Sequence, residues 1–472
     1  MIIEQIYTGC LAQSAYYIES NGEAAFIDPL REVQPYLNKA AHHKAEIMYV
    51  FETHFHADFV SGHLDLSHKT GAPIVYGPNA KPDFDFISAK DGQEFKLGNI
   101  TIKVLHTPGH TMESTSFLLK DERGVDKALF SGDTLFIGDV GRPDLAQKLV
   151  ADLTQDKLAG YLFDSLRDKI MPLADDIIVY PAHGAGSACG KKMSTETTDT
   201  LGHQKMTNYA LRPDMTKEQF IKEVTDGLVP PPAYFPLNVM MNIQGYDSID
   251  KVLERGQHAL SSEDFELIAS ETGALILDTR NPQTFAKGFI PNAINIGIDG
   301  NFAPWVGAMI TDIKQEILLI TDEGREEEVI TRLARVGYDY TIGYLKGGFE
   351  SWKNSGMGVD FIQSVSVDEL AKIMNHESIN ILDVRKNSEY LSEHLKTAEN
   401  LPLDFINDSM AQIDKNKKYF VHCAGGYRSM IFNSILRARG FNNLIDVQDG
   451  FKAIKESEKF EVTDYVCPST LL

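Results

Sequence analysis

The chain has 472 residues, of which 43% are hydrophobic and 24% charged, and its formal net charge is −22. Because domains usually hold about 100–200 residues, we expect two to four of them. The negative charge excludes an extended nucleic-acid-binding surface, since a polyanion would be repelled. The sequence has neither a membrane-spanning apolar stretch nor a basic and then apolar amino-terminal segment. It therefore predicts a cytoplasmic protein with small-molecule partners, without nucleic acid or membrane, and leaves open whether it forms homo-oligomers.

The chain has only four cysteines, and none forms a CxxC pair. This pattern favours neither a disulfide framework nor a structural zinc site. Any chemically important cysteine is therefore predicted to act alone as a thiolate. The four are Cys10, Cys189, Cys423 and Cys467.

Strand-like runs alternate with loops over the first 210 or so residues, and ligand-type residues sit where the runs end. Strands buried between helical layers, with a site on their connecting loops, are typical of α/β folds. We predict an αββα sandwich for this part of the chain. The runs are residues 24–28, 47–53, 100–107, 127–133 and 177–183.

A proline-rich segment, residues 228–238, predicts an extended connector, because proline breaks regular structure. Beyond it the chain contains an internal repeat in which an Asp-x-Arg motif and a Gly-Phe pair both recur. The sequence thus predicts one domain of one kind and two of another. Their predicted bounds are residues 1–250, which include the connector, 258–358 and 359–472.

Histidines and aspartates follow the strand-like runs at several separate places. Alternate residues at a strand end can converge on one ion, and imidazole and carboxylate groups suit first-row metals. We therefore predict a metal site in the first domain. The candidate ligands are His54, His56, Asp58, His110, Asp133 and His183.

This pattern resembles the metallo-β-lactamase fold superfamily, whose signature is HxHxDH followed by further His, Asp and His positions. In dinuclear members such as glyoxalase II, the last histidine of the signature helps to hold a second metal ion. That position is Phe59 here. We therefore predict one ion, bound by a subset of His54, His56, His110 and Asp133.

Two histidines and one carboxylate with open positions are typical of non-haem Fe(II) oxygenases. The stretch GDVGRPDL, with Arg142 and Asp144, is similar to a segment of the persulfide dioxygenases of this superfamily. The resemblance implies one Fe(II) per chain, with zinc as the alternative in purified protein. It places the iron on His54, His110 and Asp133, with His56 beside it or as a fourth ligand. The implied substrates are a low-molecular-weight thiol persulfide and O2, and the product is sulfite.

Other residues are expected around the metal or substrate rather than as ligands. Asp58 and His183 would support the site, with a purely structural role left open for His183. Arg142 and the nearby lysines Lys191 and Lys192 are local cations that could attract an anionic thiol, although solvated lysines are the alternative. Cys189 is predicted to lie near the metal, either relaying sulfur or as a passive buried thiol.

The second repeat contains VHCAGGYRSM, in which Cys423 directly follows a predicted strand and precedes a helical run. Successive backbone N–H groups and a helix amino terminus favour a thiolate and could cradle a persulfide. The loop resembles that of rhodanese sulfurtransferases. The resemblance makes Cys423 the nucleophile and Arg428 part of its loop.

The first repeat has a similar framework with TDEGREE in place of this loop. Asp322 falls where Cys423 would stand and Arg325 falls over Arg428, and because these two pairings differ in offset by two, the loop is shorter by two residues. Aspartate cannot carry a sulfane sulfur. We therefore interpret the first repeat as a pseudo-rhodanese domain.

From end to end the chain resembles fusions of a persulfide dioxygenase with rhodanese domains. This implies oxidation of a thiol persulfide to sulfite and formation of thiosulfate at Cys423, for sulfide detoxification. A zinc-dependent, glyoxalase II-like thioester hydrolase fused to a rhodanese is the first alternative. The second is a non-catalytic sulfur carrier or redox-responsive protein.

Overall fold

The computed structural model describes residues 1–145 and 153–467 of the chain. They form two compact units, Met1–Lys251 with Leu333–Gly337 and Val252–Arg332 with Tyr338–Leu472. No helix in the described ranges is both long and apolar enough to span a membrane.

The first unit contains two six-stranded sheets. In each sheet, strands that follow one another in the chain also lie side by side. The first sheet is β1 (Ile2–Thr8), β2 (Gln13–Ser20), β3 (Glu23–Ile27), β4 (Glu46–Glu52), β5 (Ile74–Tyr76) and β6 (Ile87–Ser88). The second is β7 (Glu94–Leu97), β8 (Ile100–His106), β9 (Thr115–Lys120), β10 (Asp126–Gly132), β11 (Ile178–Pro181) and β12 (Asp199–Thr200). Each of the five runs expected from the sequence overlaps one of these strands.

The second sheet is buried on both faces, and alternate residues of its strands enter different cores. Phe117 and Leu119 of β9 pack between the two sheets, whereas Leu118 packs against the helices on the other side. In β10, Phe130 likewise packs between the two sheets, and Leu129 packs against the helices. Strands apolar at successive positions are what burial on both faces requires.

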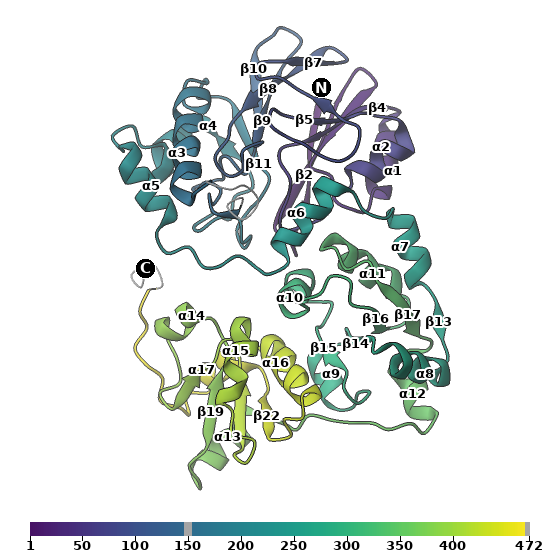
Figure 1. Ribbon diagram of the computed structural model, residues 1–472. Helices are drawn as coiled ribbons and strands as arrows, with labels where there is room; N and C mark the ends of the chain where they lie inside the picture. Colours follow the sequence, from purple (N-terminus) through teal and green to yellow (C-terminus); the bar gives the residue numbers. More distant parts are fainter. Residues whose placement is uncertain (146–152, 468–472) are drawn as a thin grey trace. The chain divides into compact units, whose positions relative to one another are not determined.

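Helices cover the outer faces, with α1 (Gln34–His43) and α2 (His63–Thr70) on the first sheet and α3, α4 and α5 on the second (Figure 1). This confirms the predicted αββα sandwich. The remaining helices of the unit are α3 (Gln155–Ser165), which continues as a π turn over Leu166–Ile170, α4 (Leu201–Thr207), a 3-10 turn (Tyr209–Leu211), α5 (Lys217–Thr225) and α6 (Phe235–Gln244). Helix α7 (Ile249–Gly256) begins in this unit and ends in the other.

The prediction of an extended connector over residues 228–238 was wrong for its last part, because α6 begins at Phe235. Pro236 lies in the first turn of that helix. A first-turn residue has no intrahelical partner for its N–H, so proline costs nothing there. Residues 228–230 have no regular structure, as expected.

The second unit contains two five-stranded parallel sheets with the same strand order. The first, in the order β13-β17-β16-β14-β15, comprises β13 (Ala259–Leu260), β14 (Leu275–Asp278), β15 (Ile294–Asn295), β16 (Ile317–Ile320) and β17 (Thr341–Leu345). The second, in the order β18-β22-β21-β19-β20, comprises β18 (Ser364–Val365), β19 (Asn380–Asp383), β20 (Ala398–Asn400), β21 (Tyr419–His422) and β22 (Leu444–Val447). The identical order confirms the internal repeat.

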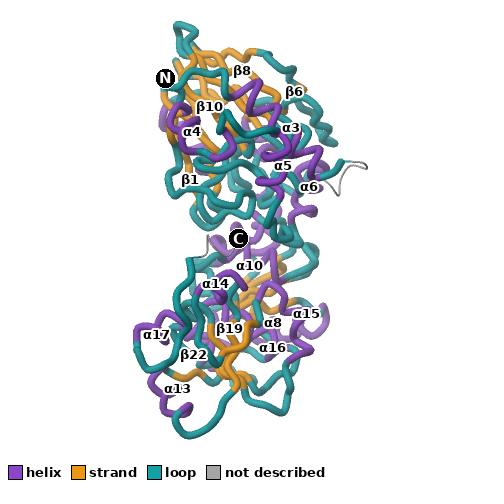
Figure 2. The backbone as a smooth tube through the Cα atoms, turned by 90° about the vertical axis from the view of Figure 1, so that its left-hand side faces the viewer, coloured by secondary structure: helices purple, strands orange, loops and turns teal. Residues whose placement is uncertain are grey.

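Helices surround both of these sheets (Figure 2). In the first repeat they are α8 (Ser262–Thr272), α9 (Pro282–Ala286), α10 (Phe302–Met309), α11 (Glu326–Arg335) and α12 (Gly348–Asn354). In the second they are α13 (Val367–Met374), α14 (Asn387–Ser392), a 3-10 turn (Leu403–Phe405), α15 (Ile406–Ser409), a second 3-10 turn (Met410–Gln412), α16 (Tyr427–Ala438) and α17 (Gly450–Glu456).

Helix α16 joins the two repeats into one unit. Its Met430 is fully buried in the core of the first repeat. Its Ser434 hydroxyl accepts a hydrogen bond of 2.9 Å from the backbone N–H of Asn295, and Arg437 forms an ion pair of 2.6 Å with Asp360. The helix that follows the Cys423 loop is therefore held by both repeats.

A buried Asp–Arg pair occurs in both repeats. Arg280 binds the carboxylate of Asp278 at 2.5–3.0 Å, and Arg385 binds that of Asp383 at 2.6–3.0 Å. Each arginine also lies over a phenylalanine ring, at 4.3 Å in the first repeat and 4.0 Å in the second. Because the repeat without a cysteine keeps the same pair, we assign the pair to the fold rather than to chemistry.

This assignment predicts the effect of Arg280→Met. Removing the arginine leaves the carboxylate of Asp278 buried and unpaired, so the unfolding free energy should fall by about 3–5 kcal/mol. The double variant Asp278→Leu/Arg280→Met should recover most of this loss, because it buries no charge. Urea unfolding followed by circular dichroism measures both. A loss below about 1 kcal/mol for the single variant would contradict the structural role.

Candidate active sites

Strand ends bring the candidate ligands of the first unit together. His54, His56 and Asp58 follow β4, whereas Asp133 follows β10 and His183 lies two residues beyond β11. His110 lies in the loop between β8 and β9. All six side chains are buried, with at most 5% of their surface exposed.

The Asp133 carboxylate lies at the centre of this group. Its Oδ2 lies 3.3 Å from Nε2 of His110 and 3.8 Å from Nε2 of His54. Its Oδ1 lies 3.6 Å from Nε2 of His183. Neither oxygen has a hydrogen-bond partner among the described residues. A buried carboxylate without partners is costly, so the arrangement fits a bound cation.

The hydrogen bonds of two histidines direct their Nε2 atoms toward Asp133. The hydroxyl of Thr53 donates to the Asp28 carboxylate at 2.8 Å, so it accepts from Nδ1 of His54 at 2.9 Å. Nδ1 of His110 donates to the Arg142 carbonyl at 2.8 Å. With the proton on Nδ1, each Nε2 lone pair is free to bind a metal ion. Nothing in the sequence motif singled out Asp28 or Thr53, although Thr53 directly precedes the first ligand.

The electrostatics of His54 agree with a ligand role. Burial, reinforced by the imidazoles of His56, His110 and His183, holds the pKa of His54 well below its usual range. A neutral imidazole is the form that binds metals. His54, His110 and Asp133 have ligand atoms within 4.8 Å of one another, and their two-nitrogen, one-carboxylate donor set fits a divalent first-row metal.

His56 is held mainly by two carboxylates. Its Nε2 lies 3.1 Å from Oδ1 of Asp28 and 3.5 Å from Oε2 of Glu52. Although burial lowers the pKa of His56, the two carboxylates raise it well above its usual range. The structure thus places His56 beside the three-ligand set, where the sequence left it either adjacent or a fourth ligand.

A second group of possible donors lies next to the first. His56, Asp58 and His183 also have ligand atoms within 4.8 Å of one another. Phe59, the position that breaks the sequence signature, is fully buried and stacks on the His56 ring with centroids 4.2 Å apart. Phe59 offers no donor and His56 already contacts two carboxylates, so this group is poorer in free donors than the first.

Arg142 is buried and hydrogen-bonded within the first unit. Its guanidinium binds the Asp144 carboxylate through two hydrogen bonds of 2.6 Å, and it donates to the carbonyls of Ala188 and Val229. Only 4% of the residue is exposed. Lys191 likewise donates to two backbone carbonyls. Four of the five guanidinium N–H groups of Arg142 are thus bound within the protein, and its attraction of an anionic thiol stays a prediction.

Cys189 lies within the ligand group. Its thiol has donor atoms of Asp133 and His183 within 4.8 Å, and the residue is 1% exposed. Burial, with the carboxylates of Asp58 and Asp133, raises the pKa of this thiol well above its usual range. The carbonyl of Cys189 accepts a hydrogen bond from the backbone N–H of Arg142 at 2.9 Å.

A cavity of about 200 Å³ opens beside His110. Its walls are mostly apolar, and they include Phe55, Met112 and Ile243, with Lys81 and Glu113 among the polar lining residues. A mostly apolar cavity with a few polar groups next to a reactive centre is the usual form of a small-molecule site.

The second candidate site follows β21. Cys423 is 1% exposed, and its sulfur accepts a hydrogen bond of 3.1 Å from the backbone N–H of Gly426. Gly426 has φ +89°, which a residue with a side chain rarely adopts, and helix α16 begins at Tyr427. One N–H group of the predicted cradle, that of Gly426, thus contacts the sulfur at the amino terminus of α16.

Arg428 lies in the first turn of α16, where the sequence analysis placed it at the end of the loop. Its guanidinium forms two hydrogen bonds, of 2.6 and 2.9 Å, with the Glu389 carboxylate on α14. The arginine is thus fixed at the loop by a partner that the motif did not reveal.

In the first repeat, the position of Cys423 is taken by Thr321 rather than Asp322. Asp278 pairs with Ile320 as Asp383 pairs with His422, so the residues that follow the two strands correspond. The loop has five residues from Thr321 to Arg325, against six from Cys423 to Arg428. It is therefore shorter by one residue and not by two, because the pairing of Asp322 with Cys423 from the sequence misplaced the end of the strand by one residue.

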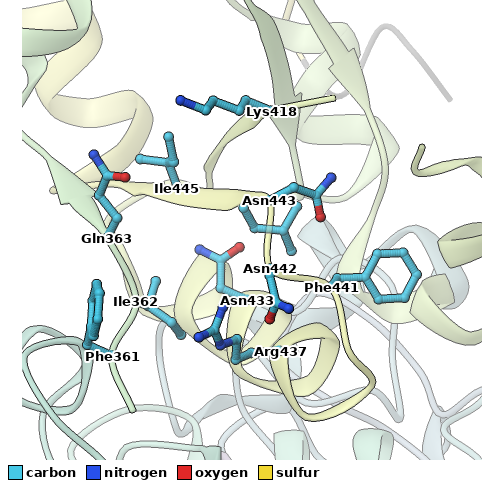
Figure 3. Close-up of a pocket in the computed structure, with 11 residues that line it drawn as sticks. Phe361, Ile362, Gln363, Lys418, Asn433, Arg437, Phe441, Asn442, Asn443 and Ile445 are labelled. Carbon is cyan, nitrogen blue, oxygen red and sulfur yellow. The ribbon is translucent and has the colours of Figure 1, made fainter. Parts of the chain in front are cut away.

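A second cavity, of about 220 Å³, lies in the second unit, away from Cys423 (Figure 3). Leu444 and Ile445 at the start of β22 line it, and so do Asn433 and Arg437 in the later turns of α16. This is the amino edge of the sheet, whereas Cys423 follows the carboxyl end of β21.

Comparison with known proteins agrees with this architecture. Residues 8–183 match the metallo-beta-lactamase superfamily, and residues 261–355 and 366–457 each match the rhodanese-like domain. A metallo-beta-lactamase of known structure from Staphylococcus aureus is 33% identical, with a TM-score of 0.64, over 73% of this chain and 98% of that one. The chain belongs to the metallo-beta-lactamase superfamily, and two rhodanese-like domains follow the domain that defines it.

Other relatives match the first domain. The hydroxyacylglutathione hydrolase GloC of Haemophilus influenzae is 28% identical over 41% of this chain and 95% of its own length. The chain spans about half the length of other curated hydroxyacylglutathione hydrolases. A solved structure of ETHE1 from Myxococcus xanthus is 28% identical, with a TM-score of 0.43, over 51% of this chain and all of that one.

The hydrogen bond that orients His54 gives a prediction. Thr53→Val removes the hydroxyl that accepts from Nδ1, so the affinity for Zn(II) should fall by about 10–100-fold. Competition with a chelating dye measures it. Thr53→Ser keeps the hydroxyl and should bind as the native protein does. Equal affinity in the valine variant would show that the tautomer of His54 is set by something else.

Proposed function

We propose that the chain is a non-haem iron persulfide dioxygenase joined to a thiosulfate-forming sulfurtransferase. The observation that carries the proposal is the combination, in one chain, of a single well-prepared His–His–Asp ligand set with a cysteine cradled in a rhodanese-like loop. Sulfide detoxification, in the cytoplasm, is the cellular role that we infer.

The residues of the first domain have separate tasks in this proposal. His54, His110 and Asp133 would hold Fe(II), which when bound activates O2 toward sulfur. Thr53 and the Arg142 carbonyl keep the two imidazoles in the tautomer that can bind the metal. The apolar cavity beside His110 would bind the thiol carrier and exclude water. Binding there would hold the persulfide close to the metal, so that the reacting groups meet within one site.

The proposed chemistry has three steps. A thiol persulfide, O2 and water yield the thiol and sulfurous acid, with the outer sulfur oxidised and O2 reduced. A second persulfide then transfers its outer sulfur to the Cys423 thiolate and leaves as a thiol. Sulfite attacks that sulfur, the sulfur–sulfur bond to Cys423 breaks, and thiosulfate leaves with the thiolate restored.

A thioester hydrolase is the second candidate, and one observation favours it. The curated relatives of the first domain are hydroxyacylglutathione hydrolases, and His56, Asp58 and His183 lie together next to the first ligand set. A second metal ion there would create a dinuclear site of the kind used for hydrolysis. Phe59 and the carboxylates on His56 weigh against it.

Metal content distinguishes the two candidates. Anaerobically purified protein should contain about one iron per chain and consume O2 when given glutathione persulfide, because only the first set has three free donors. His110→Ala should abolish O2 uptake yet retain sulfur transfer from thiosulfate to cyanide at Cys423. Two metal ions of equal occupancy, with hydrolysis of S-lactoylglutathione, would establish the hydrolase instead.

Removing the second nucleophile should change the product. In Cys423→Ser, O2 uptake with glutathione persulfide should continue while sulfite accumulates in place of thiosulfate, because a hydroxyl is a far poorer nucleophile than a thiolate. Chromatography of the sulfur oxyanions measures both products. Thiosulfate formed at the native rate would mean that another cysteine, Cys189 first, carries the sulfur.

A further inference from the structure

A buried carboxylate lies behind the Cys423 loop. Asp446, in β22, is fully buried, and its oxygens accept hydrogen bonds from Gln283 at 2.8 Å, Ser429 at 2.9 Å and Ser364 at 3.4 Å. Among the described residues these partners are all neutral. Burial, aided by the nearby Asp449 carboxylate and opposed by these hydrogen bonds, raises the pKa of Asp446 to about 6. An ionised carboxylate with neutral partners destabilises a fold, so its presence calls for another explanation.

Ser429 connects this carboxylate to the sulfur. Its hydroxyl lies 2.9 Å from Oδ1 of Asp446 and 3.2 Å from the carbonyl of Gly426. Gly426 in turn donates its N–H to the Cys423 sulfur at 3.1 Å. The carboxylate therefore holds the first turn of α16, and this turn sets the position of the N–H group on the sulfur.

Gln283 comes from the other repeat. It lies in α9 of the first repeat and donates to Oδ2 of Asp446. It also lines a cavity of about 230 Å³ at the mouth of the loop, together with Gly425, Gly426 and Tyr427. The Tyr427 hydroxyl donates to the carbonyl of Gly297, also in the first repeat, at 2.6 Å. The repeat that lacks a cysteine thus contacts the catalytic loop of the other.

The two repeats provide an internal comparison. Strand register puts Tyr344 in the place of Asp446 and Ala259 in the place of Ser364. Alignment of Arg325 with Arg428 in the sequence puts Glu326 in the place of Ser429. The buried Asp–Arg pair is present in both repeats, whereas this polar cluster occurs only in the repeat with the cysteine. The polar cluster therefore accompanies the cysteine, and the fold by itself does not require it.

We propose that Gln283, Asp446 and Ser429 are positioning residues that hold the Gly426 N–H on the Cys423 sulfur, so that the first repeat is needed for sulfur transfer by the second. This rests on the proposed sulfurtransferase function. It gives the repeat without a cysteine a specific task, which is to supply the neutral amide that anchors the carboxylate.

The first test uses alkylation of Cys423 by iodoacetamide in the full-length protein, which requires no catalysis. Cys423 alkylation is followed by mass spectrometry at fixed pH. Gln283→Leu and Ser429→Ala should each slow it by about tenfold, because the N–H that stabilises the thiolate is no longer held in place. Ser429→Thr keeps the hydroxyl and should restore the native rate. Glu326→Ala, at the equivalent site of the first repeat, should change nothing.

The second test separates a positioning role from a merely structural one. Because the pKa of Asp446 is raised on folding, its ionisation destabilises the fold as pH rises through about 6. Asp446→Asn should therefore raise the melting temperature at pH 8, with the gain vanishing near pH 4, yet slow Cys423 alkylation. Stability and reactivity that fall together would indicate structure alone and overturn the proposal.

The rate of sulfur transfer from thiosulfate to cyanide tests the proposed sulfurtransferase function separately from the positioning role. In Gln283→Leu and Ser429→Ala, kcat should fall by about tenfold with KM little changed. If the native protein transfers no sulfur but alkylation responds to the substitutions, the proposed function fails and the positioning role stands. If the native protein is active and both variants match it in both assays, the positioning role is overturned.

Discussion

The buried carboxylate of Asp133 is the group on which the first domain depends. Its two oxygens lie 3.3–3.8 Å from three imidazole nitrogens, and none of the described residues donates a hydrogen bond to them. Such a cluster is stable only if a cation takes the place of the missing donors. The strand ends that deliver these side chains, and the hydrogen bonds that orient His54 and His110, follow from this one requirement.

The second unit meets a similar demand at Cys423 without a metal ion. Cys423 is 1% exposed, and the Gly426 N–H at the start of α16 donates a hydrogen bond to its sulfur. Both sites therefore use backbone geometry at the carboxyl end of a strand to stabilise a buried negative charge. In the proposed reaction the first site makes sulfite and the second consumes it, which explains their presence in one chain.

The first repeat keeps the fold of the second but lacks the cysteine that carries the chemistry. Both keep the Asp–Arg pair, because removing either partner would bury an unpaired charge. The first repeat has Thr321 in place of the nucleophile and a loop shorter by one residue. The first repeat still packs against α16, because Met430 of that helix lies in its core and Asn295 donates a hydrogen bond to Ser434 of the helix. Through these contacts the first repeat supports the Cys423 loop, which precedes α16.

The sequence by itself determined the αββα sandwich, the repeat and the residue types at each strand end, because burial on both faces of a sheet and a recurring Asp-x-Arg motif leave local patterns. Only the tertiary structure decided which side chains meet. The role of Arg142 depends on Asp144 and on carbonyls far along the chain. The alignment of Thr321 with Cys423 depends on strand register, and the contact between Gln283 and Asp446 joins residues of different repeats. Such long-range contacts have no local signature, since they arise only when separate elements pack.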